Sequence, residues 1–121
     1  MDQKLNSEKP IFSQIAENIE SSILDGSIKE GEKVPSTNEF GKYYQINPAT
    51  AAKGINQLVD QKILFKKRGI GMFVTDGAKE MIFEKRKKDF YNDYIIPLKA
   101  EANKLGLSKE ELSILINKEE E

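Results

Sequence analysis

The chain has 121 residues, of which 38% are hydrophobic and 32% charged, and its formal net charge is −1 at pH 7. It contains no cysteine and no histidine, which excludes disulfides, cysteine nucleophiles, imidazole catalysis and zinc sites built on those ligands. No apolar run is long enough for a membrane span or a secretory leader. We therefore expect a cytoplasmic protein with no metal, no cofactor and no enzymatic activity.

The first predicted element is a helix that begins near Pro10 and ends at Asp25-Gly26. Proline suits the first turn, where no N–H is needed, and glycine suits a left-handed stop. Isoleucines recur every four residues and define one buried face, with Phe12 and Ala16 beside them. These isoleucines are Ile11, Ile15, Ile19 and Ile23.

Two short helices with almost no connection between them are predicted next. Ser36 and Glu39 form a capping-box pattern at the start of the first helix. Its apolar side carries Phe40, Tyr43 and Tyr44. Asn47 can cap the second helix, and Pro48 suits its first position. Two helices so close in sequence indicate a helix-turn-helix, whose second helix lies in the DNA major groove.

The second of these helices has two different faces. Its predicted core face carries Ala51, Ile55, Leu58 and Val59. The opposite face carries Ala49, Ala52, Lys53 and Asn56, flanked by Thr50 and Gln57. Small residues allow close approach, Lys53 can pair with phosphate or guanine, and Asn56 can pair with adenine. The alternative for each polar residue is an ordinary solvated side chain.

A basic hairpin is predicted directly after the helix-turn-helix. Two apolar, β-prone runs, 63–65 and 72–74, flank a basic tip with Lys66, Lys67, Arg68 and the glycines Gly69 and Gly71. A hairpin in this position is a wing, which can reach the DNA backbone or minor groove. Residues 36–75 hold six basic and two acidic residues, so this part of the chain is suited to a polyanion.

The remaining residues predict helices. Tyr91, Ile95, Leu98, Ala102 and Leu105 recur at heptad-like spacing, with Phe83 and Phe90 upstream. Pro97 should kink or divide this helix, Gly106 should end it, and Ser108 with Glu111 should cap another. The aromatic residues could form a dimer interface, pack within the chain or line a small-molecule pocket. We favour the interface because a two-helix tail cannot bury such a stripe alone.

The order of these features resembles the GntR family of bacterial transcription regulators. The segment PIFSQIAENIESSILDGSIKEGEKVPSTNEF is similar to the family's opening signature. The segment INPATAAKGINQLVDQKILFKKRGIGMFV resembles the YtrA-type subfamily, with Asn-Pro-x-Thr at the recognition helix and Lys-Arg-Gly-x-Gly-x-Phe-Val in the wing. The resemblance implies a dimer whose short tail lacks the ligand-binding domain of larger relatives, and often control of ABC-type transporter operons.

Together, these residue patterns and the resemblance predict a set of DNA-binding residues. They are Ser36, Thr37, Asn38, Asn47, Pro48, Ala49, Thr50, Lys53, Asn56, Lys66, Lys67, Arg68, Gly69 and Gly71. Asn38 stands where the family usually has an arginine that commonly contacts DNA. Asparagine lacks the charge and the bidentate fork of arginine, so weaker or altered readout is expected there.

The predicted fold is mainly α with a small β-hairpin: a winged helix-turn-helix domain over residues 1–76 and a two-helix dimerisation tail over 77–121. The predicted interface residues of the tail are Phe83, Phe90, Tyr91, Tyr94, Ile95, Leu98 and Leu105. The expected partners are double-stranded DNA with a palindromic sequence, a second copy of the chain and a small-molecule inducer of unidentified chemistry. The expected function is a repressor; the alternative is a winged-helix protein-interaction module without sequence-specific DNA binding.

Overall fold

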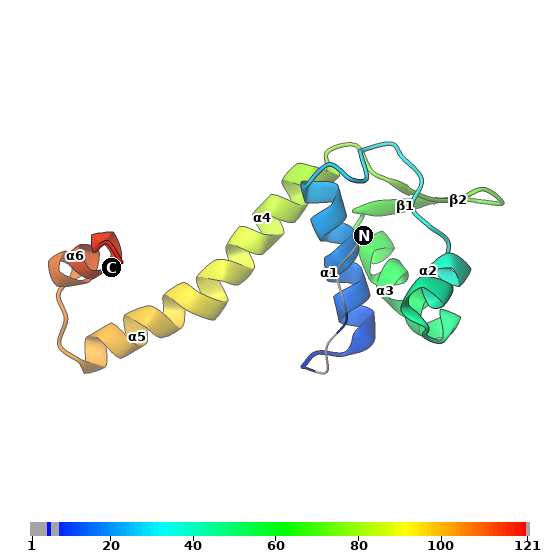
Figure 1. The fold of residues 1–121 in the computed structure, drawn as a ribbon. Helices are drawn as coiled ribbons and strands as arrows, with labels where there is room; N and C mark the ends of the chain where they lie inside the picture. Colours follow the sequence, from blue (N-terminus) through cyan, green and yellow to red (C-terminus); the bar gives the residue numbers. More distant parts are fainter. Residues whose placement is uncertain (1–4, 6–7, 121) are drawn as a thin grey trace. The chain divides into compact units, whose positions relative to one another are not determined.

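The computed structural model describes residue 5 and residues 8–120, and the chain divides into two compact units, Met1–Phe83 and Glu84–Glu121. The first unit contains α1 (Ile11–Leu24), α2 (Thr37–Tyr44), α3 (Pro48–Asp60), β1 (Leu64–Lys67) and β2 (Gly71–Val74) (Figure 1). The next helix, α4 (Ala78–Phe90), spans the boundary, and the second unit continues with η1 (Tyr91–Ile95), α5 (Ile96–Lys104) and α6 (Lys109–Asn117). The predicted fold class, mainly helical with one small hairpin, is confirmed.

The core of the first unit is built on the predicted face of α1. Ile15, Ile19 and Ile23 are buried and pack with Ile55 and Leu58 of α3. Ile11 was predicted on the same face, but 40% of its surface is exposed. It is the first residue of the helix, and helical side chains lean toward the N-terminus, so Ile11 extends beyond the first turn instead of over the core.

Helices α1 and α3 approach each other closely at Gly54. A Cβ atom at this position would lie 2.6 Å from the backbone oxygen of Phe12 and 3.1 Å from Cβ of Ile15. The glycine therefore allows the recognition helix to lie directly against the backbone of α1. The orientation of the exposed face of α3 depends on this contact.

Helix α2 begins with the predicted capping box. The backbone N–H of Glu39 donates to the hydroxyl of Ser36 at 3.1 Å, and the N–H of Ser36 donates to the Glu39 carboxylate at 3.0 Å. Phe40 is buried, and the Tyr44 hydroxyl accepts a hydrogen bond from Asn18 of α1.

Tyr43 is not part of the apolar side of α2 that packs on the core, and 55% of its surface is exposed. Phe40 and Tyr44, four residues apart, share one face of the helix. Tyr43 lies about 100° from Tyr44 around the axis, which turns it toward solvent.

The two strands form an antiparallel hairpin in which Phe65 pairs with Phe73 and Lys67 with Gly71. The predicted basic tip was partly wrong: Lys66 and Lys67 belong to strand β1, and only Arg68 of the three lies in the turn. The turn is closed by a hydrogen bond from the N–H of Ile70 to the carbonyl of Lys67, at 2.9 Å.

A third segment, residues 31–34, pairs with the free edge of β2. The N–H of Val34 donates to Met72, and the N–H of Val74 donates to Glu32. Lys33 is thereby opposite Phe73. Figure 1 shows this connection between α1 and α2 passing along the hairpin. The sequence pattern predicts only turns here, because a single bridge has no periodicity.

Helix α4 is capped by a residue from far back in the chain. The Glu30 carboxylate accepts hydrogen bonds from the backbone N–H groups of Gly77 and Lys79, at 2.9 and 3.1 Å. These bonds hold the pKa of Glu30 below its ordinary value. The start of α4 is thus bound to the connection that precedes α2.

Pro97 neither breaks the tail helix nor leaves it a regular α-helix. Residues Tyr91–Ile95 form a π-helical segment, and the N–H of Ile96 donates to the carbonyl of Tyr91, five residues back. The wider turn relieves the clash that a proline ring makes with the carbonyl four residues before it. Gly106 follows the end of α5 with a φ of +70°, and α6 begins with the predicted capping box of Ser108 and Glu111.

Candidate nucleic-acid interface

The exposed face of α3 begins at a sharply defined N-terminus. The Asn47 side chain accepts a hydrogen bond from the N–H of Ala49 at 2.9 Å, and Pro48 occupies the first turn, as predicted. Ala49, Lys53 and Asn56 are exposed, whereas Thr50 and Ala52 are half-buried. The helix therefore presents a narrow surface of small and amide-bearing residues with one lysine.

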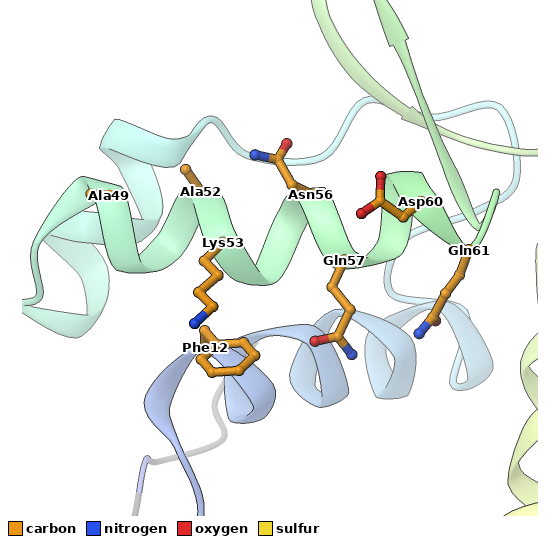
Figure 2. A pocket seen from close by; sticks show the side chains of 8 residues that line it. All are labelled: Phe12, Ala49, Ala52, Lys53, Asn56, Gln57, Asp60 and Gln61. Carbon is orange, nitrogen blue, oxygen red and sulfur yellow. The ribbon is translucent and has the colours of Figure 1, made fainter.

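A shallow hollow of about 590 Å³ runs along this face between α3 and the first turn of α1. Figure 2 shows the lining side chains: Phe12, Ala49, Ala52, Lys53, Asn56, Gln57, Asp60 and Gln61. The Lys53 ammonium lies over the ring of Phe12, 4.1 Å from its centroid. Phe12 was predicted only as a neighbour of the apolar face of its helix; no sequence signal pairs it with a residue 41 positions later.

The electrostatic character of α3 changes along its length. Its N-terminal end carries the positive end of the helix dipole and Lys53 one turn further on. Its C-terminal end carries the exposed carboxylate of Asp60. A polyanion is attracted to the first half of the helix and repelled by the second.

The start of α2 offers polar groups from the predicted set. Ser36 and Asn38 are exposed and Thr37 is half-buried. The Ser36 oxygen accepts a hydrogen bond from the N–H of Glu39, and the Ser36 side chain also hydrogen-bonds the Glu39 carboxylate. The Glu39 carboxyl has a lowered pKa, mainly because it accepts from the Ser36 backbone, and it stays charged beside this site.

The outer face of the wing combines aromatic and basic side chains. The rings of Phe65 and Phe73 stack with centroids 5.9 Å apart, and 39% of the Phe65 surface is exposed. The Lys67 ammonium lies over Phe73, 4.4 Å from the ring centroid. Lys66, Arg68 and Gly69 are exposed around the turn, where Gly69 adopts a φ of +77°.

The structure brings the predicted DNA-binding residues together in the unit Met1–Phe83. Apart from Phe83, the predicted interface residues of the tail lie in the unit Glu84–Glu121. Six of the seven are exposed, and Ile95 is half-buried. Phe90 and Tyr94 pack side by side at 5.5 Å between ring centroids.

Within residues 5 and 8–120, no cluster of acidic residues could hold a metal, and no helix is long and apolar enough to cross a membrane.

The sequence pattern of the gntR family of bacterial regulatory proteins matches residues 12–74, more than half of the chain. The chain belongs to this family. The match begins in α1 and ends in β2, so it covers the helix-turn-helix and the wing. The resemblance found in the sequence is confirmed.

Individual GntR relatives extend the likeness to most of the chain. It is 29% identical over 106 residues to the HTH-type transcriptional repressor YtrA of Bacillus subtilis, covering 88% of this chain and 81% of YtrA. A putative GntR-family transcriptional regulator from Bacteroides thetaiotaomicron superposes with a TM-score of 0.77 at 32% identity, covering 88% of this chain and 92% of that one. The structure of AraR(DBD) in complex with operator ORR3 superposes with a TM-score of 0.53 at 34% identity, covering 62% and 93%.

Proposed function

We propose that this GntR-family chain is a sequence-specific DNA-binding transcription regulator that acts as a repressor. The observation that carries the proposal is the exposed first half of α3, where Thr50 and Lys53 follow an Asn-Pro helix start in the same unit as a basic wing. The operator complex of AraR(DBD), which shares this fold, supports a DNA ligand. The protein would act in the cytoplasm by binding alone, without catalysis.

In the proposed complex, α3 enters the major groove with its N-terminal half. Ala49 and Ala52 allow close approach, Lys53 contacts a guanine edge or a phosphate, and Asn56 contacts a base at the edge of the site. Asp60, which lines the same hollow at the other end of the helix, lies farther from the phosphates that the first half contacts. At the start of α2, the side chains of Ser36, Thr37 and Asn38 contact the DNA backbone. Asn38 contributes no charge to this contact.

We further propose that two copies pair through the tail and bind a palindromic operator, with an inducer of unidentified chemistry releasing the complex. The exposed aromatic and aliphatic residues of the second unit support a partner surface there. Two-fold symmetry then sets the half-sites about one helical turn, or a multiple of it, apart. Repression would follow from occlusion of a promoter.

The test is selection of bound duplexes from a random DNA pool, followed by salt titration of the selected sequence. A palindromic consensus whose affinity falls by about 0.9 log units per phosphate contact for each log unit of salt supports the proposal. Lys53→Ala should then weaken the consensus complex by about 1–3 kcal/mol if Lys53 reads a base. If no sequence is enriched, with or without metabolite extract, the DNA-binding proposal is wrong and a protein-docking role replaces it.

A further inference from the structure

The side chain of Lys33 lies against the wing at Gly71. A Cβ atom built on Gly71 would lie 2.6 Å from Cε of Lys33 and 3.5 Å from its Nζ. The aliphatic stem of Lys33 therefore occupies the space that a side chain at position 71 would fill. The φ of Gly71, +146°, is also one that favours glycine. Glycine at position 71 therefore both adopts the backbone conformation of the turn and leaves room for the Lys33 side chain.

The register of the sheet fixes where this lysine lies. Lys33 is opposite Phe73, and Phe73 is opposite Phe65, so these three residues form one row across the outer face. Gly71 is opposite Lys67, one row closer to the turn. The stem of Lys33 crosses from its own row onto that next row, so its ammonium lies in the row that already contains Lys67.

Lys33 also lies near the start of α2. Only Val34 and Pro35 separate it from Ser36, and its charge contributes to the lowered pKa of Glu39, after the hydrogen bonds from Ser36. The Glu39 carboxylate accepts a hydrogen bond from the Ser36 backbone and keeps its charge, so it attracts the Lys33 ammonium toward the start of α2. Lys33 thus stands between two surfaces that the proposed function brings to the DNA backbone.

We propose that Lys33 is a phosphate-contacting residue that joins the wing and the start of α2 into one continuous backbone-binding surface. This inference rests on the proposed function. The stem packed over Gly71 restricts the side chain, so less conformational freedom is lost when the ammonium meets a phosphate. A phosphate contact positions the protein on the duplex but reads no sequence.

The experiment compares Lys33→Gln with the wild-type protein on the selected operator and on a scrambled duplex, each titrated with salt. Glutamine keeps part of the stem and removes the charge. Affinity should fall roughly fivefold on both duplexes, and the salt slope should decrease by about 1. The matched control is Lys29→Gln, an exposed lysine of the same connection, which should leave both quantities unchanged.

A second variant separates charge from packing. Lys33→Arg keeps the positive charge and should retain the wild-type salt slope. If Lys33→Gln leaves the slope unchanged, or if Lys33→Arg loses as much affinity as Lys33→Gln, Lys33 makes no phosphate contact and the inference is overturned. Wild-type protein that binds no duplex would overturn the proposed function and this inference together, whereas normal binding by Lys33→Gln overturns this inference alone.

Discussion

At the scale of single residues, Gly54 shows how one helix can constrain the composition of another. Glycine in a helix interior costs about 1 kcal/mol relative to alanine, so an isolated α3 would gain from Gly54→Ala. In the folded protein the added methyl group would meet the backbone oxygen of Phe12 at 2.6 Å, and backbone cannot turn aside as a side chain can. We expect Gly54→Ala to lower the free energy of unfolding by about 1–3 kcal/mol, measured by urea denaturation. A more stable variant would mean that α1 moves away freely.

The contact between Phe12 and Lys53 leads to a second prediction. The ring holds the Lys53 ammonium at the edge of the hollow before DNA arrives. Phe12→Leu keeps an apolar side chain but removes the π face, so operator binding should weaken by about 0.5–1 kcal/mol. A double-mutant cycle with Lys53→Met measures the coupling. The loss should vanish in the Lys53→Met background; an equal loss in both backgrounds would assign Phe12 to packing alone.

What the sequence could predict at this scale depended on the distance between partners along the chain. The caps at Ser36, Asn47 and Ser108 were predicted correctly because each cap bonds a residue two or three positions away. The partners of Phe12 and Glu30 were missed because they lie more than 40 residues away. Only the fold brings such pairs together.

At the scale of elements, the wing was predicted as a hairpin but is completed by residues 31–34. The hairpin was recognised because two β-prone runs flank glycine, while the third segment lies among turn residues and contributes a single bridge. The predicted strand end was wrong at Lys66 and Lys67, because exposed lysines are compatible with the end of a strand as well as with a turn. The predicted DNA-contacting roles of these lysines stay predictions.

The cap on α4 gives stability a pH dependence. The pKa of Glu30 is lowered by the hydrogen bonds from Gly77 and then Lys79, so folding favours the charged carboxylate. Its stabilising contribution is present above the ordinary pKa of 4.5 and is lost as the pH falls through the lower folded value. Glu30→Gln should therefore reduce the melting temperature at neutral pH and by less in acid. Thermal unfolding of both proteins across this range checks it, and parallel curves at every pH would contradict it.

At the scale of the whole molecule, the exposed apolar residues of the second unit lead to a prediction about assembly. A charge added at Tyr94, whose ring packs with Phe90, would have to be desolvated in any tail-to-tail dimer. Tyr94→Lys should convert a dimer to monomers in sedimentation equilibrium. It should weaken binding to a palindrome while leaving affinity for a single half-site unchanged. Asn92→Lys, which adds the same charge at an exposed polar position of the same π-helical segment, is the control. Dimerisation of Tyr94→Lys as strong as that of the control would exclude this surface.

The sequence predicted the fold class and the family because local signals occur in a fixed order along the chain. It left open whether Pro97 kinks or divides the tail helix; a wider helical turn was a third solution that spacing alone could not distinguish. The domain boundary expected at residue 76 and the compact unit that ends at Phe83 differ by half of α4, since a continuous helix gives no composition change at a boundary.

The bond between Glu30 and the start of α4 also has a consequence for the order of folding. It joins residues 47 and 49 positions apart, so the chain must first close a long loop, whereas the helix-turn-helix is built from neighbours in sequence. Such a contact is expected to form after the transition state. Glu30→Gln should then accelerate unfolding while leaving the refolding rate nearly unchanged in stopped-flow measurements. During synthesis, α4 would acquire its cap only after the strands before it have paired, so the cap would be among the last contacts that the unit Met1–Phe83 forms.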